Sequence, residues 1–194
     1  MNRKAELKRQ QIIKAAYQAV SDKGYEAVTL QDIANYANVS KGVPNYYFEN
    51  KEDVLAHLLA QITERIYKKE KEAVEKETSV QEMLQAYINT VFVSPEENEK
   101  FYRVYLDFLA QATKNNRYRE INARFYQNCA SISKEILTQA RKENVFVIND
   151  FETASRAIRT MIDGYMIQWM MTGDYAQHRS YKQACYQAIT TYLS

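Results

Sequence analysis

The chain has 194 residues, a formal net charge of +2 and 46% hydrophobic residues. A chain of this length buries roughly 70% of its unfolded surface, so it folds without disulfides or metals. Cys129 and Cys185 lie outside any CxxC or His-rich pattern, which predicts buried free thiols and no metal site. No apolar stretch reaches membrane-spanning length and no secretory leader opens the chain, so we expect a cytoplasmic protein.

Positive charge is concentrated at the start of the chain. The first fourteen residues contain one acidic residue, Glu6, and five basic residues: Arg3, Lys4, Lys8, Arg9 and Lys14. A basic segment on a nearly neutral body suits a polyanionic partner. The segment either contacts the backbone or minor groove of DNA, or forms a frayed, solvated arm.

The first helices are marked by their end signals. Four glycines and two prolines in the whole chain predict long helices with short connections. The first helix should cover residues 3–22, and Gly24 should end it in the left-handed conformation. A second, short helix should begin after Thr29, whose hydroxyl forms a reciprocal capping box with Asp32.

A tight turn should join the second helix to a third. Asn38 tolerates the left-handed conformation of such a turn, and Ser40 should cap a helix that runs to about Tyr47. Pro44 lies about four residues after this cap, where a missing amide hydrogen still costs little. Two short helices around a tight turn are typical of a helix-turn-helix, although any helical bundle also contains short helices with small-residue corners.

The rest of the chain reads as longer helices, and no strand is expected. The predicted helices cover residues 50–77, 79–93, 94–113, 117–143, 151–172 and 180–193. Residues 68–77 are nearly all charged and should be exposed to solvent, and 144–150 should be a loop. The predicted fold is therefore all-α with about nine helices, an N-terminal helix-turn-helix domain and a C-terminal helical bundle.

Several segments resemble the TetR family of bacterial regulators. Residues 29–34 (TLQDIA), 37–42 (ANVSKG) and 47–55 (YFENKEDVL) are similar to its N-terminal domain, and the resemblance extends from about Ile12 to Leu59. Residues 162–168 (IDGYMIQ) are similar to the dimerisation helix of the BetI-like subgroup. The resemblance implies a DNA-binding domain over 1–49 and a ligand-binding and dimerisation domain over 50–194.

The resemblance further implies a homodimer that represses transcription from a palindromic operator and is released by a small-molecule effector. It implies groove contacts at Lys41, Gly42, Val43, Asn45 and Tyr46, phosphate contacts at Thr29, Tyr47 and Lys51, and a further DNA contact at Gln31. Pro44-Asn45 replaces the aliphatic residue and tyrosine usual in the family, and Asn38 replaces the usual turn glycine. Asn45 either reads a base, since an amide can bond adenine bidentately, or bonds a phosphate or water.

Aromatic and methionine side chains are abundant, with 16 Tyr, 7 Phe, one Trp and six Met. Such side chains suit a small hydrophobic or cationic effector, although each stripe alone is more often ordinary core. The candidate effector-binding residues are Tyr87, Tyr105, Phe108, Phe125, Tyr126, Cys129, Met166 and Trp169. Asp163 is either the counter-charge of a ligand or a partner of Arg156 or Arg159.

The last two predicted helices are candidates for a four-helix dimer interface, because the first of them is apolar on more than one side. The candidate interface residues are Ala157, Met161, Gly164, Tyr181, Cys185, Ala188, Ile189 and Tyr192. Catalysis is disfavoured, since the only histidines are His57 and His178 and neither an HExxH motif nor a phosphate-binding glycine loop is present. No cofactor is expected. The alternative function is a helical protein-interaction module that does not bind DNA.

Overall fold

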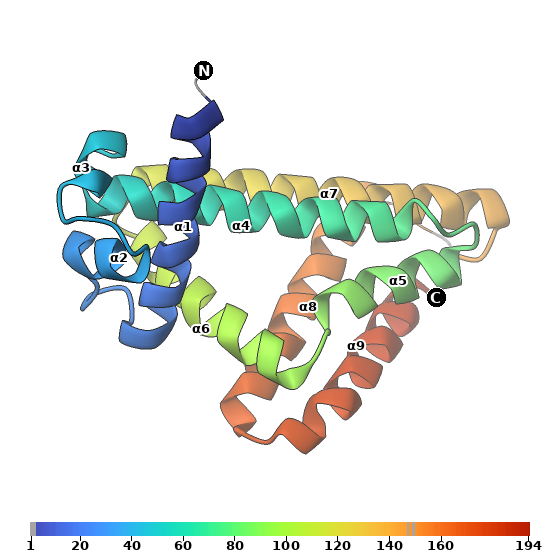
Figure 1. Cartoon of the computed structure of the whole chain (residues 1–194). Helices are drawn as coiled ribbons and strands as arrows, with labels where there is room; N and C mark the ends of the chain where they lie inside the picture. Colours follow the sequence, from blue (N-terminus) through green and yellow to red (C-terminus); the bar gives the residue numbers. More distant parts are fainter. Residues whose placement is uncertain (1–2, 147, 149) are drawn as a thin grey trace. The chain divides into compact units, whose positions relative to one another are not determined.

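A computed structural model describes residues 3–146, 148 and 150–194, and every regular element in this part is helical (Figure 1). The elements are α1 (Arg3–Lys23), α2 (Leu30–Tyr36), α3 (Val43–Tyr47), α4 (Lys51–Val74), α5 (Val80–Val91), α6 (Pro95–Ala112), α7 (Asn116–Glu143), α8 (Phe151–Thr172), the 3-10 helix η1 (Tyr175–Gln177) and α9 (His178–Leu193). The predicted all-α class is confirmed. The predicted loop 144–150 includes positions 147 and 149, which lie outside the described residues. No described helix combines the length and apolar character needed to cross a bilayer.

The chain forms two compact units. The first unit contains the residues up to Glu64 together with Lys100–Ala123, and the second contains Arg65–Glu99 and Arg124–Ser194. Helices α4, α6 and α7 therefore each contribute residues to both units. This division is one of packing, so the functional boundary after residue 49 stays a prediction.

The core of the first unit is built by α1, α2 and the start of α4. Its fully buried aliphatic residues include Ile12, Ala16, Ile33, Ala34, Val54, Leu55 and Leu59. Tyr25, in the loop after α1, is tied to later elements of the same unit. Its amide donates to the Asp107 carboxylate at 3.0 Å, and its hydroxyl lies 3.0 Å from that of Tyr118. The end of α6 and the start of α7 thereby support the loop that leads into α2.

The predicted signals at the ends of α1 and α2 are confirmed. Gly24 and Asn38 adopt left-handed conformations, with φ of 80° and 51°. Thr29 and Asp32 form both halves of the capping box at the start of α2. These backbone features set the short connections on either side of α2.

The start of the third helix differs from the prediction. Helix α3 begins at Val43 with Gly42 as its N-cap, and Ser40 does not cap it. The Val43 amide instead donates to the Ser40 carbonyl at 2.9 Å, in a turn made by Lys41 and Gly42. Had the helix begun after Ser40, Pro44 would stand where an amide must donate back to that carbonyl. In the observed helix Pro44 is the second residue, where no helical partner is lost.

In the second unit α8 and α9 lie side by side and antiparallel, and α5 packs against α9 (Figure 1). Its fully buried residues include Leu84, Ile88, Ile158, Ile162, Met166, Cys185 and Ile189. Both cysteines are buried and free, as expected. The prediction that residues 68–77 are exposed is wrong at two positions, since Glu70 and Val74 are buried. Val74 belongs to the apolar core, and the buried Glu70 forms an ion pair with Arg159 of α8.

Candidate DNA interface and effector site

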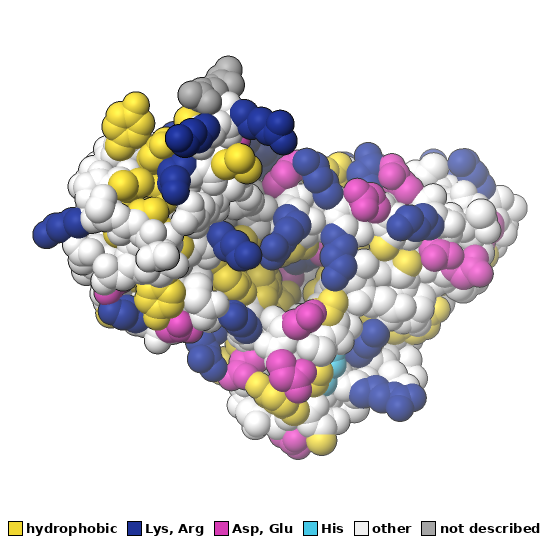
Figure 2. Space-filling model, in the orientation of Figure 1, with side chains coloured by type: hydrophobic (Ala, Val, Ile, Leu, Met, Phe, Trp, Pro, Cys, Tyr) yellow, Lys and Arg dark blue, Asp and Glu magenta, His cyan; other side chains and the backbone are white. Residues whose placement is uncertain are grey.

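Helix α3 and the turn before it present polar and aromatic side chains to solvent. Tyr46 is 82% exposed, and Lys41, Gly42 and Asn45 are exposed beside it. Figure 2 shows exposed hydrophobic side chains together with Lys and Arg side chains over the first three helices. Val43 is half-buried, so of the predicted groove contacts it is the least accessible. This segment offers a cation, an amide and an aromatic ring on one exposed surface.

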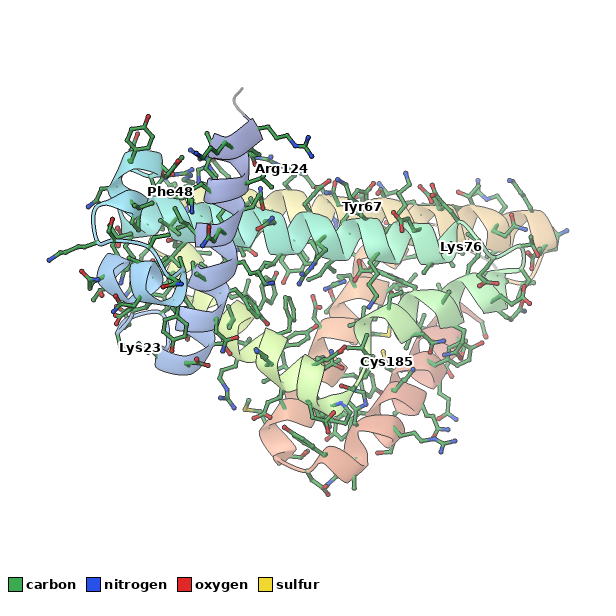
Figure 3. The ribbon with its side chains drawn as sticks, viewed as in Figure 1. Lys23, Phe48, Tyr67, Lys76, Arg124 and Cys185 are labelled. Atoms are coloured by element: carbon green, nitrogen blue, oxygen red, sulfur yellow. The ribbon has the colours of Figure 1, made fainter. Side chains whose placement is uncertain are left out.

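Arg9 and Phe48 hold α3 in place. Arg9 Nη1 donates to the carbonyl of Tyr47, the last residue of α3, at 2.7 Å. The same guanidinium lies 4.7 Å from the centre of the Phe48 ring, which meets the His57 ring edge-on at 5.4 Å (Figure 3). Helix α1 begins at Arg3, so the expectation of a frayed arm is wrong. At least Arg9 serves to position α3, because its side chain is directed at the end of that helix.

The candidate phosphate contact Thr29 uses its hydroxyl within α2. The hydroxyl donates to Asp32 Oδ2 at 2.7 Å and accepts from the Asp32 amide at 3.1 Å. Hydrogen bonds from Lys23 and Thr29 lower the pKa of Asp32 to about 2, so this carboxylate is charged at neutral pH. A phosphate contact through the Thr29 side chain would therefore require the capping box to open.

The side chains of Lys51 and Gln31 also form hydrogen bonds within the first unit. Lys51 Nζ donates to the Tyr25 carbonyl at 3.3 Å and lies 5.2 Å from the centre of the Tyr25 ring. The Gln31 amide donates to Asn35 Oδ1 at 2.9 Å. Tyr47 is half-buried, and its ring meets that of Tyr46 edge-on at 5.0 Å. Of the nine predicted DNA-binding residues, five are exposed: Thr29, Lys41, Gly42, Asn45 and Tyr46.

Three helices bring a charged cluster into the core of the second unit. Glu70 of α4 is 1% exposed, and its Oε1 lies 3.1 Å from Nη1 of Arg159 on α8. Arg159 Nε lies 3.0 Å from Asp163 Oδ1, one turn further along α8, but the two atoms are not aligned for a hydrogen bond. The centre of the Phe125 ring of α7 is 5.0 Å from the guanidinium. The guanidinium thus occupies a site made of two carboxylates and one aromatic ring.

Burial dominates the electrostatics of this cluster. Burial raises the pKa of Glu70, and this effect exceeds the lowering of the pKa by the nearby Arg159. Burial alone would lower the pKa of Arg159, but the charges of Asp163 and Glu70 hold it above its usual value. Burial raises the pKa of Cys129 to about 12, and its thiol lies 3.8 Å from Glu70 Oε2. The Tyr87 hydroxyl is buried and has no hydrogen-bond partner among the described residues, and its pKa is raised by burial.

The eight candidate effector residues fall into both units. Tyr105 and Phe108 belong to the first unit, and the other six belong to the second. In the first unit Tyr105 donates to Asn122 Oδ1 at 3.1 Å, and the Phe108 ring meets the ring of Tyr118 at 5.6 Å. In the second unit Tyr126 is 37% exposed, whereas the remaining candidates are buried: Tyr87, Phe125, Cys129, Met166 and Trp169.

Asp163 pairs with Arg159, one of the two partners considered for it, while Arg156 pairs with Glu152. Sequence reasoning missed Glu70, because it lies within a run of charged residues. Only its partner, 89 positions away in the sequence, distinguishes it from its exposed neighbours.

Six of the eight candidate dimer-interface residues are at least partly exposed on the single chain: Ala157, Met161, Gly164, Tyr181, Ala188 and Tyr192. A Cβ built on Gly164 would meet no atom within 4 Å, so this part of α8 is open to an approaching helix. Cys185 and Ile189 are fully buried. They lie on the side of α9 that packs into its own unit, so they offer no surface to a second copy and are removed from the candidate interface.

Comparison with known proteins decides the family. Residues 12–58 match the family of bacterial regulatory proteins named after TetR, and residues 80–194 match the C-terminal domain of BetI-type transcriptional repressors. The chain belongs to the TetR family. It is a transcriptional regulator and not an enzyme, and the predicted resemblance, including that to the BetI-like subgroup, is confirmed.

Curated TetR-family relatives align over most of their length. A regulator called BetI from Serratia proteamaculans (strain 568) is 28% identical over 194 residues, which cover 95% of this chain and 89% of the relative. A BetI regulator from Pseudomonas aeruginosa (strain LESB58) is 25% identical over 177 residues, covering 87% and 84% of the two chains.

Solved structures show the same fold at low identity. A TetR regulator from Haloarcula marismortui has a TM-score of 0.86 at 23% identity and covers 97% of this chain and 98% of its own. A putative regulator from Saccharomonospora viridis in complex with choline has a TM-score of 0.84 at 20% identity, with 93% and 94% covered. FadR from Bacillus subtilis in complex with stearoyl-CoA has a TM-score of 0.75 at 22% identity, with 93% and 97% covered.

Proposed function

We propose that this TetR-family regulator binds a palindromic operator as a homodimer, and that a small hydrophobic or cationic effector bound in its second unit releases the DNA. The proposed place of action is the cytoplasm, where a regulator would meet the DNA that it controls. The observation that carries the proposal is the exposed α3 segment, held from behind by Arg9 and Phe48 while Lys41, Asn45 and Tyr46 are exposed. A short, anchored helix with such side chains suits the major groove of B-DNA.

A two-fold dimer would present two α3 helices to successive half-sites of a palindrome. The partly exposed face formed by Ala157, Met161 and Gly164 on α8, with Tyr181 and Ala188 on α9, supports such a dimer. Light scattering at micromolar concentration should give the mass of two chains, and a stable monomer would contradict this part of the proposal.

The cluster around Arg159 supports a cationic effector. Phe125, Glu70 and Asp163 surround the Arg159 guanidinium, and the same set of groups would hold an organic cation that displaced this guanidinium. The structural neighbour from Saccharomonospora viridis was solved with choline, a quaternary ammonium ion. Another structural neighbour was solved with stearoyl-CoA, which carries a long apolar chain. The alternative effector is therefore a long apolar ligand, which would pack against the buried Met166 and Trp169. An effector shifts DNA affinity only by its preference for one state, typically about 1–3 kcal/mol.

Fluorescence anisotropy with labelled DNA from upstream of the coding region, at two salt concentrations, tests DNA binding. Lys41→Ala should weaken binding and reduce the salt slope by up to about one unit, because it removes one cation that displaces counterions from the DNA. Lys76→Ala, which removes an exposed lysine just beyond the end of α4 (Figure 3), is the matched control and should change neither value. Absence of salt-dependent DNA binding by the unaltered protein would favour the protein-interaction module.

Choline and stearoyl-CoA, added separately to the preformed complex, test the effector class. Release of DNA by choline favours the cationic class, and release by stearoyl-CoA favours the hydrophobic class. If neither these probes nor their shorter and longer homologues lower the anisotropy, the proposed effector classes are wrong.

A further inference from the structure

A groove in the second unit lies between α5 and α9 and has a volume of about 700 Å³. Its lining contains Arg179, Lys182 and His178 from α9 and four amide side chains, among them Gln85 and Asn89 from α5, and no Asp or Glu. This volume is in the range of small-molecule sites in proteins. The groove is therefore large enough for a metabolite, and it is polar and positively charged.

The two cations of the groove have no carboxylate partner. Arg179 and Lys182 lie on one side of α9, three positions apart, and neither forms an ion pair within the described part of the chain. Lys182 is partly buried, and its Nζ donates to the Phe92 carbonyl at 3.3 Å. Burial lowers the pKa of Lys182, because no nearby carboxylate offsets the loss of hydration. An anion beside Lys182 and Arg179 would supply the missing counter-charge.

His178 connects the groove to the only tryptophan of the chain. Its Nε2 lies 2.8 Å from Asn98 Oδ1, while the Asn98 amide nitrogen donates to the Val91 carbonyl at 2.8 Å. The Asn98 oxygen can only accept, so Nε2 carries the proton and Nδ1 is the atom that titrates. The His178 ring meets the Trp169 ring edge-on at 4.6 Å. Burial and then the charge of Lys182 lower the pKa of His178, and Glu96 opposes them.

The groove stays accessible in the proposed dimer. With 3.6 residues per turn, Arg179 and Tyr186 lie on the side of α9 roughly opposite to Tyr181 and Ala188, which belong to the candidate dimer face, and Lys182 lies about 100–120° around the helix from them. A ligand in the groove and a second copy on the dimer face would not compete for the same surface of α9.

We propose that the α5–α9 groove binds a small polyanion, a phosphorylated or polycarboxylate metabolite, through Arg179 and Lys182. The guanidinium of Arg179 holds one anionic group in two parallel hydrogen bonds, and Lys182 neutralises a second. The amides of Gln85, Asn89 and their neighbours on α9 donate to the remaining oxygens. None of the lining residues of this groove belongs to the Arg159 cluster, and His178 contacts Trp169 of the candidate effector residues.

Calorimetric titration of the full-length protein with citrate and with pyrophosphate, at an ionic strength held constant with sodium chloride, tests the proposal. We expect saturable binding of one anion per chain by either probe. The double variant Arg179→Gln/Lys182→Gln should bind at least tenfold more weakly. The matched control Lys76→Gln, an exposed lysine of the same unit, should bind like the unaltered protein.

Trp169 fluorescence followed against pH gives a second readout. A bound anion offsets the charge of Lys182, so it should move the titration of His178 to higher pH in the unaltered protein but not in the double variant. Thermal unfolding checks that the double variant is folded. Absence of saturable binding, equal affinity of the double variant, or an equal loss in Lys76→Gln would overturn the proposal. A change of oligomeric state in the double variant would overturn it too, since the groove would then belong to a contact between copies.

Discussion

Arg9 Nη1 donates to the carbonyl of Tyr47 at 2.7 Å, which joins α1 to the last residue of α3. A helix of five residues is too short to be stable alone, so its position depends on such contacts. The bond satisfies a carbonyl that has no helical partner at the C-terminal end, and a cation there also suits the helix dipole. We infer that α1 sets the angle at which α3 meets DNA.

Arg9→Met should weaken DNA binding without changing its salt dependence, because the side chain positions α3 and does not neutralise a phosphate. Loss of the hydrogen bond should also destabilise the fold by on the order of 1–2 kcal/mol. Urea unfolding and anisotropy titrations over a range of salt concentrations measure the two effects. Lys76→Met, at an exposed position of the second unit, is the control for the general loss of charge. A salt slope reduced by a full unit in Arg9→Met alone would assign Arg9 to the phosphates instead.

Asn45→Ala should relax the base preference at one operator position. Asn45 is exposed on α3, and an asparagine amide discriminates adenine from other bases by about 1–3 kcal/mol when both its hydrogen bonds form. Affinities for a set of operators with each base changed in turn give the measurement. Equal weakening on every operator, with no position relaxed, would show that Asn45 bonds a phosphate or water.

Asn38→Ala should destabilise the first unit by about 1 kcal/mol, because φ of 51° is unfavourable for a side chain without a local polar group. Asn38→Gly, the matched variant, should leave stability nearly unchanged since glycine adopts this conformation freely. Urea unfolding midpoints compare the two. Equal stability of both variants would mean that the turn before α3 is not held in this conformation.

Arg159→Met should lower the free energy of unfolding by about 3–5 kcal/mol, because it leaves two carboxylates in the core of the second unit without a cation. The double variant Glu70→Gln/Arg159→Met should recover part of this loss, since the buried charge that Arg159 neutralised is also removed. Urea unfolding of the two single variants and the double variant measures the coupling. Additive losses would show that the two side chains do not interact.

Glu70→Gln should change how stability depends on pH. Burial raises the pKa of Glu70, so the folded chain binds this proton more tightly than the unfolded chain does. The contribution to stability is fully present below the unfolded pKa, near 4.5, and is lost as pH rises through the raised folded pKa. The difference in unfolding free energy between the unaltered protein and Glu70→Gln should therefore shift in favour of the variant as pH rises. A difference independent of pH would contradict the raised pKa.

The sequence was sufficient for features that depend on local chemistry. Gly24, Thr29 and Asn38 sit at helix ends, where one residue's conformation or hydrogen bond decides the outcome, and all three were predicted correctly. The predicted start of α3 is wrong. Ser40 is a typical N-cap residue, but a helix that began there would need an amide hydrogen at Pro44, so α3 begins later.

Features that depend on distant partners could not be predicted. Glu70 looked like part of an exposed charged run, and only the fold brings Arg159 to it. The same holds for Arg9, whose role depends on the carbonyl of Tyr47 in another helix. The anion groove likewise arises from two helices, α5 and α9, that are far apart in the chain.

Amide hydrogen exchange of the full-length protein, with and without its upstream DNA, tests whether the α3 segment enters the groove. Residues 41–47 should be protected on adding DNA, and Lys41→Ala should reduce that protection at equal protein concentration. Residues of α9, in the second unit, serve as the internal reference and should be unaffected. If exchange over 41–47 is the same with and without DNA while the complex is fully formed, α3 is not the DNA-reading helix.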